Sequence, residues 1–266
     1  MHDLLHDLAS FVAKNECCIV NSFEQNIVPE IRHVCLVYSD DSSDENASKL
    51  FNKIGYLCTL EFPICNKSFT ETCLKRFQHL RMLDLSKSNF EVLPKWIGNL
   101  KHLRKLNISN RPNIKKLPNS ICELQKLQTL DFDGCDQIEE LPKDMRHVVN
   151  LRFLSLTTKQ RDLRGSQKLT SLHTLIFSGC NNLGFKEKEA DDDIQDYLIH
   201  NSFSHQSLAI LDLPKLEALP QWLLLVSANT LENLMLDHRH PYGAAKKKSC
   251  DPNQGSMCEE RIRVKE

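Results

Sequence analysis

The residues best placed for metal chemistry lie at the start of the chain, where His2, Asp3 and His6 occur in the order His-Asp-Leu-Leu-His. Two histidines four positions apart on a helix share one face, and zinc proteases use this spacing with a glutamate as the general base. Here aspartate replaces the glutamate, which shortens the reach of the base, and no third ligand follows at a plausible spacing. We therefore expect no metal site at these residues.

Two further patterns could support chemistry. Residues 179–186, GCNNLGFK, are close to a phosphate-binding loop, but Phe185 stands where that loop has its lysine. The other set is thinly spaced for a zinc site and consists of His238, His240, Cys250 and Cys258. The chain also has no Gly-x-Ser-x-Gly nucleophile elbow, so we expect no enzyme activity, with an ATPase or a metalloprotease as the last-ranked alternative.

Composition narrows the classes of partner. The 34 Lys and Arg residues nearly balance the 35 Asp and Glu residues, so no large positive field favours nucleic acid or an anionic membrane. No apolar run approaches the roughly 18 residues that a membrane-spanning helix needs, and no signal peptide is apparent. The 11 cysteines are an odd number and are scattered apart from the adjacent Cys17 and Cys18. We expect reduced thiols and a cytoplasmic protein.

A sequence repeat predicts the strands that would position any functional residue. The phrases LRMLDLS (80–86), LRKLNIS (103–109), LQTLDFD (127–133) and LRFLSLT (151–157) begin 23, 24 and 24 residues apart. A period of this length with the pattern Leu-x-x-Leu-x-Leu is typical of a leucine-rich repeat, in which each unit contributes one short strand to a curved parallel sheet. We therefore expect an α/β leucine-rich-repeat solenoid.

The array extends on both sides of these four units. Earlier strands are expected at Ile31 and Leu57, and later ones at Leu172, Leu208 and Leu231, which gives about nine strands. We expect a short amphipathic helix over residues 1–14 and an insertion at about 183–205 that contains the acidic stretch 186–197. The tail, 241–266, is polar and expected to be disordered.

Each regular unit closes with Leu-Pro, at residues 93–94, 117–118 and 141–142. Proline cannot donate to a strand ladder, so these segments predict a convex side of loops or short helices. Within the strands, side chains alternate between the core and the concave face. The residues expected to be exposed there are Met82, Asp84, Ser86, Lys105, Asn107, Ser109, Thr129, Asp131, Asp133, Phe153, Ser155 and Thr157. Lys105, Asp131, Asp133 and Phe153 are the foremost candidates for contacting a partner, because charge and an aromatic ring give specificity and anchoring area.

Two motifs in order carry a resemblance to a known family. Met1-His2-Asp3 followed by LLHDLA resembles the Met-His-Asp motif at the end of the nucleotide-binding region of plant nucleotide-binding leucine-rich-repeat disease-resistance proteins of the coiled-coil class. VPEIRHVCLV and the stretch from Leu80 to Ser109 resemble the junction and the early repeats of the same family. The resemblance covers most of residues 1–240.

The resemblance implies a division of the chain and roles for its first residues. Residues 1–25 would be the end of a nucleotide-binding, winged-helix-like domain, and 26–240 the leucine-rich-repeat domain. His2 would correspond to the histidine that lies against the phosphates of bound ADP, with Asp3 as its neighbour. The phosphate-binding loop and the coiled coil are absent, so we expect no ADP or ATP in this chain, which would be a fragment, a truncated product or a gene-model artefact.

Two functions remain open at this stage. The first is a recognition module of an intracellular plant immune receptor, which binds a pathogen effector, a guarded host protein or the receptor's own nucleotide-binding domain. The second is a stand-alone intracellular leucine-rich-repeat scaffold. Both predict a protein partner, no nucleic acid and no transmembrane segment.

Overall fold

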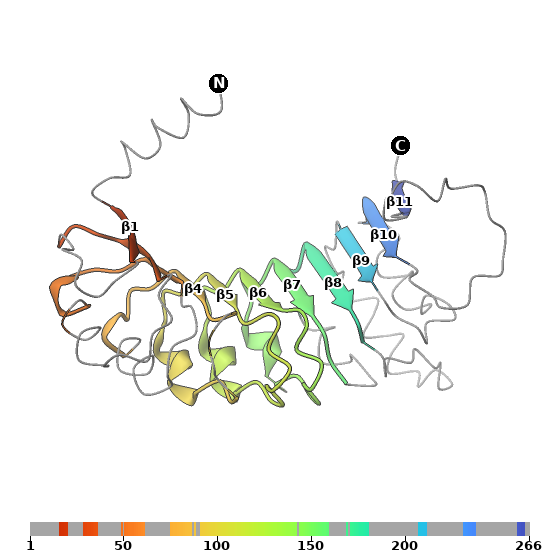
Figure 1. The fold of residues 1–266 in the computed structure, drawn as a ribbon. Coiled ribbons are helices and arrows are strands. Elements are labelled where there is room, and N and C mark those ends of the chain that lie inside the picture. Colours follow the sequence, from red (N-terminus) through yellow and green to blue (C-terminus); the bar gives the residue numbers. More distant parts are fainter. Residues whose placement is uncertain are drawn as a thin grey trace, which may run out of the picture.

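In a computed structural model, the described residues form one eleven-stranded sheet in which the strands follow one another in chain order, β1 to β11 (Figure 1). The structure describes residues 16–20, 29–36, 49, 51–61, 75–86, 88, 91–142, 144–159, 169, 171–180, 207–211, 231–237 and 260–263. The expected helix over 1–14 and the expected insertion at 183–205 lie outside these residues.

The strands are short and regularly spaced along the chain. They are β1 Cys17–Val20, β2 His33–Leu36, β3 Thr59–Glu61, β4 Met82–Asp84, β5 Lys105–Asn107, β6 Thr129–Phe132, β7 Phe153–Leu156, β8 Thr174–Ser178, β9 Ser207–Leu211, β10 Asn233–Asp237 and β11 Glu260–Arg263. The strands β1 to β10 all pair in parallel, whereas β11 pairs antiparallel with β10. The leucine-rich-repeat solenoid expected from the period is confirmed.

The register shows why the period produces this sheet. Counting the leading leucine of each unit as position 1, the leucines at position 4 pair with one another from strand to strand: Leu60, Leu83, Leu106, Leu130, Leu154 and Leu175. All six are at most 3% exposed. Side chains on a strand alternate between its two faces, so positions 4 and 6 enter the core and positions 3, 5 and 7 face outward. We call the outward face the concave face.

The expected strand count was two too low. Strand β1 is an addition at the start of the sheet, and β11 is a strand within residues 241–266. The register assigned to Leu208 was also wrong. Leu208 pairs with Leu175 and therefore occupies position 4, not position 1. The run SLAIL is apolar on both faces near Leu208, so its pattern does not specify which residues face the core.

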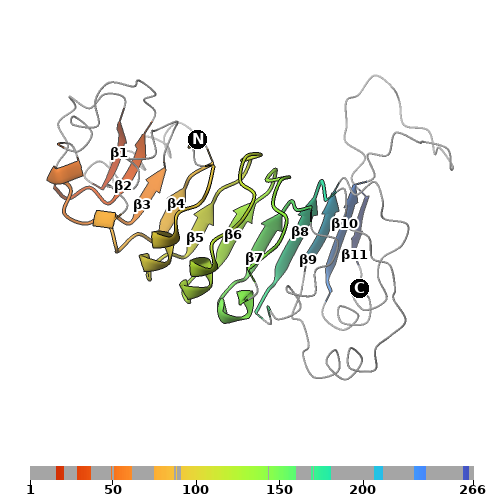
Figure 2. The ribbon, with the colours of Figure 1, turned by 90° about the horizontal axis from the view of Figure 1, so that it is seen from below.

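Among the described residues, the side of the solenoid opposite the strands carries three short 3-10 helices, η1 Lys95–Asn99, η2 Asn119–Glu123 and η3 Met145–His147 (Figure 2). Residues 51–53 and 75–76 are also helical. Pro94 and Pro118 stand at the N-caps of η1 and η2 in extended conformations, with φ of −71° and −69°. The expectation that Leu-Pro leads into short convex segments is confirmed, because proline's fixed φ suits a helix start and its missing N–H is not needed there.

Neighbouring convex helices lie very close together where η1 meets η2. A Cβ placed on Gly98 would come 2.7 Å from the carbonyl oxygen of Ser120 and 2.8 Å from its Cβ. Only a residue without a side chain fits this position, so Gly98 sets the distance between the two helices.

The core runs without interruption along the solenoid and is filled mainly by leucine and isoleucine from both sides. Two cysteines, Cys135 and Cys180, belong to this core and are fully or almost fully buried. The Cys135 thiol donates to the carbonyl oxygen of Ile108 at 3.1 Å, and the Cys180 thiol lies 3.7 Å from that of Leu156. Each cysteine thus links its own unit to the preceding one.

Candidate functional site

The concave face between β4 and β7 gathers most of the polar residues singled out from the sequence. Register places Met82, Lys105, Thr129 and Phe153 in one row across the strands. Asp84, Asn107, Asp131 and Ser155 form a second row, at position 5 of their units. Because paired strands lie about 4.8 Å apart, each row is a line of side chains that one partner could contact together.

Three residues of the second row share one local motif. A side-chain oxygen of Asp84 accepts the backbone N–H of Ser86 at 2.9 Å, Asn107 accepts that of Ser109 at 2.9 Å, and Asp131 accepts that of Asp133 at 3.1 Å. Asp and Asn commonly bond the backbone two residues ahead, which satisfies an N–H where a strand ends. The motif holds these side chains in fixed orientations on the concave face.

A second set of bonds joins neighbouring units. The Asn107 amide donates to Asp84 Oδ2 at 2.8 Å, and Asp84 Oδ1 also accepts the Ser86 hydroxyl at 2.6 Å. The Asp84 carboxylate is thus bonded on both oxygens, while its charge stays on a half-buried surface. Hydrogen bonds to charged groups are stronger than those between neutral groups, so this pair orders the β4 and β5 part of the face.

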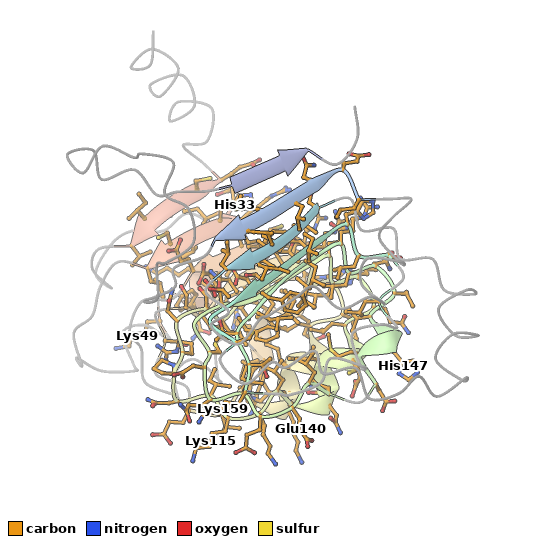
Figure 3. All side chains as sticks on the ribbon, turned by 90° about the vertical axis from the view of Figure 1, so that its right-hand side faces the viewer. His33, Lys49, Lys115, Glu140, His147 and Lys159 are labelled. Atoms are coloured by element: carbon orange, nitrogen blue, oxygen red, sulfur yellow. The ribbon has the colours of Figure 1, made fainter. Side chains whose placement is uncertain are left out.

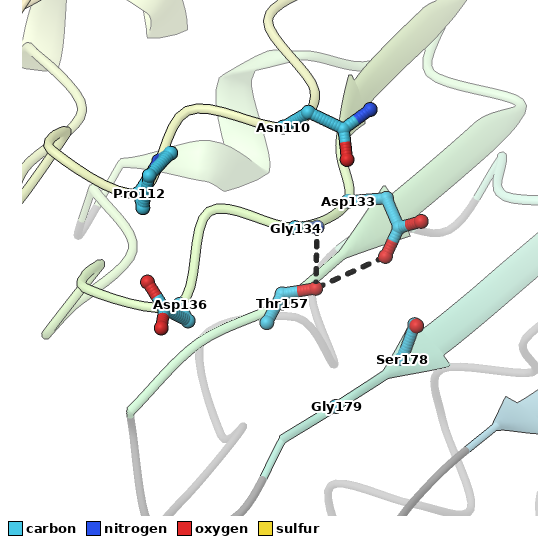
Figure 4. A pocket seen from close by; sticks show the side chains of 8 residues that line it. All are labelled: Asn110, Pro112, Asp133, Gly134, Asp136, Thr157, Ser178 and Gly179. Atoms are coloured by element: carbon cyan, nitrogen blue, oxygen red, sulfur yellow. Dashed lines mark hydrogen bonds between the residues drawn. The ribbon is translucent and has the colours of Figure 1, made fainter.

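An open depression of about 430 Å³ lies at the carboxyl ends of strands β6 to β8 (Figure 4). It is lined by Asn110, Pro112, Asp133, Gly134, Asp136, Thr157, Ser178 and Gly179. Its centre is the Thr157 hydroxyl, which donates to Asp133 Oδ1 at 3.0 Å and accepts the N–H of Gly134 at 2.8 Å. Asn110, Gly134 and Gly179 all have positive φ, at 55°, 71° and 59°. They occupy position 8 of their units, where the backbone turns away from the sheet and glycine or asparagine is favoured.

Charge on this face is mixed but mainly negative. Burial raises the pKa of the Asp131 carboxyl, and the neighbouring charges of Asp133 and Asp84 act in the same direction. The N–H of Asp133 and the charge of Lys105 act against this increase. A carboxylate whose charge is partly desolvated gains from an added cation, so Asp131 is suited to meeting a basic group of a partner.

Two of the twelve residues expected on the concave face are not exposed. Ser155 is 5% exposed and Thr157 is 4% exposed, so their expected exposure was wrong. Ser155 is a small residue between Asp131 and Ile176, its partners in the two neighbouring strands. Thr157 is held against Asp133 and Gly134 by its hydroxyl. These residues support the face and offer little contact area themselves.

The structure adds concave residues that the sequence reasoning did not name. Glu61 precedes Asp84 in the second row, and Ile176, Ala209 and Met235 continue this row beyond Ser155. The row therefore changes from acidic and polar in β3 to β6 to apolar in β8 to β10. Counting four residues past each leading position predicts these residues, except at β9, where the leading residue itself was misassigned.

Several candidates from the sequence lie outside the described residues. These are His2, Asp3, His6, His238, His240, Cys250, Cys258 and the part of the 179–186 pattern after Cys180. In the part of the chain that the structure describes, no three His, Cys, Asp or Glu side chains converge as a metal site would require. Nor does that part contain a helix with the length and apolarity to cross a bilayer.

Comparisons with known proteins agree with the fold. Residues 58–184 match the family described as "Leucine-rich repeat region". Over 116 residues the sequence is 34% identical to a protein of Solanum bulbocastanum with the name "Putative disease resistance protein RGA1", and these residues make up 43% of this chain and 9% of that protein.

One solved structure supports the same fold. A leucine-rich-repeat protein of Leptospira interrogans superposes with a TM-score of 0.54 at 19% identity, covering 81% of this chain and 51% of the other. The leucine-rich-repeat domain of the type III effector XopL superposes with a TM-score of 0.43 at 23% identity, covering 53% of this chain and 47% of the other.

Proposed function

We propose that this leucine-rich-repeat solenoid is a recognition module that binds a partner protein on the concave face of β4 to β7 and performs no catalysis. The observation that carries the proposal is the hydrogen-bonded set Asp84, Asn107, Asp131 and Asp133, whose side chains are fixed before a partner arrives. Ordering side chains in advance reduces the entropy that binding must offset. A face of this kind, on a rigid scaffold, is suited to an extended protein surface.

The proposal extends to the biological setting. The 34% identity to a protein named for disease resistance and the motif resemblance at residues 1–3 and 80–109 support a role in an intracellular plant immune receptor. In that role the partner is a pathogen effector, a guarded host protein or the receptor's own nucleotide-binding domain, and the location is the cytoplasm. ADP or ATP would belong to the nucleotide-binding domain, with His2 and Asp3 as the residues of this chain nearest to it.

A charge-reversal experiment tests the version in which the module restrains a nucleotide switch. Asp131→Lys/Asp133→Lys is compared with Glu139→Lys/Glu140→Lys, which makes the same change in net charge at exposed positions of the convex side, where Figure 3 shows Glu140. Binding to a separately expressed nucleotide-binding domain of the coiled-coil class is measured by calorimetry. We expect the first pair to weaken binding and the second to leave it unchanged. Equal affinity of both pairs and the wild type would rule out restraint through this face.

Asp133 also accepts a hydrogen bond inside the protein, so a milder variant is needed alongside. Asp131→Asn/Asp133→Asn removes both charges and keeps side-chain oxygens that can accept the same bonds. If this variant folds as the wild type does and still loses affinity, the loss comes from the concave charges and not from local unfolding.

The second candidate function is the stand-alone scaffold. Such a scaffold would bind its partner through the same concave face but would not be coupled to a nucleotide-binding switch domain. An in-frame phosphate-binding loop encoded upstream of Met1 in the genome would favour the receptor, whereas transcripts that start at Met1 would favour the scaffold.

A further inference from the structure

The concave face has two halves of different chemistry, which meet between β6 and β7. At positions 3, 5 and 7 of the units from β3 to β6, Lys105 stands against four acidic residues, Glu61, Asp84, Asp131 and Asp133. We call these four residues the acidic half. The units of β7 to β10 have no charged residue at positions 3 and 5, and position 7 is charged in Asp237 alone. The charge of the face therefore changes within one strand spacing.

The second half of the face carries an apolar patch. Ile176, Ala209 and Met235 are partners of one another in the pairing of β8, β9 and β10. Phe153 and Leu211 occupy concave positions beside them, and of these five residues all but Ala209 are half-exposed. We call these five residues the apolar half. A contiguous apolar surface beside polar residues is a common mark of a protein-binding site.

The face has the dimensions of one α-helix laid across the strands (Figure 1). Positions 3 and 7 are about 13 Å apart along a strand, and a helix with its side chains is about 10–12 Å in diameter. An extended segment is narrower and would leave part of this width uncovered. The six strand spacings from β4 to β10 add up to about 29 Å, the length of a helix of about 19 residues.

We propose that the partner covers both halves with one amphipathic helix, which carries lysine or arginine over the acidic half and apolar side chains over the apolar half. The inference rests on the proposed concave-face function and specifies the chemistry of its partner. A helix that is apolar throughout would bury the carboxylates of Asp84 and Asp131 without partners. A helix that is basic throughout would place charges against Ile176 and Met235. The two halves together therefore select a helix of mixed composition and determine which end lies over β4.

The two halves contribute to binding in different ways. Asp84 and Asp131 are already oriented by the N–H groups of Ser86 and Asp133, so a basic group meets carboxylates in fixed positions. Complementary charges mainly give specificity and faster association. Removing the apolar side chains from water supplies free energy that does not depend on salt in the same way. Binding should thus respond to salt through one half of the face only.

The probe is a designed helical peptide of about 19 residues, with lysines at i and i+4 spacing in one half and leucines at i, i+3 and i+4 spacing in the other. We call it the mixed peptide. In a glutamine peptide every lysine is replaced by glutamine, and in an alanine peptide every leucine is replaced by alanine. Fluorescence anisotropy measures the binding of each peptide to the full chain.

Three variants locate the contacts. Asp131→Asn/Asp133→Asn removes charge from the acidic half, and Ile176→Thr/Met235→Thr reduces the apolar half. The matched control is Val92→Thr/Val149→Thr, which makes a similar apolar-to-polar change beside the convex helices η1 and η3, at residues that are 61% and 56% exposed. Circular dichroism melting checks that each variant folds, and Ile176→Thr alone replaces the double variant if the latter melts early.

We expect the mixed peptide to bind the wild type and the Val92/Val149 control alike. The Asp131/Asp133 variant should bind the mixed peptide about tenfold more weakly and the glutamine peptide unchanged. The Ile176/Met235 variant should bind the mixed peptide about tenfold more weakly and the alanine peptide unchanged. Added salt should weaken binding of the mixed peptide and leave that of the glutamine peptide nearly constant.

The outcomes separate this inference from the concave-face function. If the Asp131/Asp133 variant loses affinity and the Ile176/Met235 variant does not, the concave face still binds and the mixed helix is wrong. Equal weakening of all three peptides by either variant would also overturn the inference, because the contacts would not lie where we place them. So would a lack of binding of the mixed peptide to the wild type at about 1 mM. Self-association of the chain that Ile176→Thr/Met235→Thr abolishes would assign the apolar half to a second copy instead.

Discussion

Replacing Gly98 by alanine tests the close packing of the convex helices. The added Cβ would lie 2.7 Å from Ser120 O, and an ordinary contact starts at 3.4 Å, so η1 and η2 must separate by up to 3.4 − 2.7 = 0.7 Å. The obstructing atom belongs to the backbone of η2 and cannot rotate away. Overpacking of this kind costs about 1–3 kcal/mol.

An opposing effect must be separated from this steric cost. Alanine restricts the unfolded chain more than glycine does, which stabilises by about 0.4–1 kcal/mol where the folded backbone permits it. Gly55→Ala is the matched control, because a Cβ at Gly55 meets nothing within 4 Å. Subtracting the two changes in the free energy of unfolding leaves the steric cost, about 1–3 kcal/mol.

Urea unfolding followed by circular dichroism measures both variants. Trp96 lies in η1 beside Gly98, so its fluorescence reports on the same helix. The reasoning would be refuted if Gly98→Ala were as stable as Gly55→Ala. In that case η1 and η2 can move apart without a loss in the free energy of unfolding, and close packing between units does not limit stability.

Three further predictions concern the concave face and the buried thiols. Thr157→Val should lower the free energy of unfolding by about 1–3 kcal/mol, because the Gly134 N–H loses its acceptor, and Thr157→Ser should restore most of it in urea titrations. Asp131→Asn should stabilise the fold at neutral pH. The pKa of Asp131 is raised in the folded state, so the ionised carboxylate destabilises the folded protein above that pKa. The gain in stability should disappear in acid, where the carboxyl is protonated in both the folded and the unfolded state. Burial raises the thiol pKa values of Cys135 and Cys180 to about 11, so mass spectrometry should find both unmodified by iodoacetamide at pH 8 in the folded protein and alkylated after unfolding.

The central fold could be predicted because leucine recurs at positions 1 and 4 of the units between Leu80 and Phe177, with leucine, isoleucine or phenylalanine at position 6, and only one strand register buries all three positions. Leu80, Leu83 and Leu85 are at most 1% exposed, as the pattern requires. Strand β1 was missed because its unit has Asn15 at position 1 and Cys18 at position 4, so the leucine signal is absent. Strand β9 was misregistered because Ala209 puts an apolar residue on the concave side as well.

The concave face was predictable as a row of positions but not as a network. Alternation places Asp133 and Thr157 at position 7 of neighbouring units, yet nothing local shows that their side chains bond to each other and leave Thr157 buried.

The unbroken pairing of position-4 leucines has a consequence for how such a gene can change. Because Leu83, Leu106, Leu130 and Leu154 occupy equivalent places, an unequal crossover that deletes or duplicates one whole unit joins leucine to leucine and leaves the core continuous. The same event shortens or lengthens every outward-facing row by one residue. Recombination can therefore produce new arrangements of surface side chains without first passing through a protein that fails to fold.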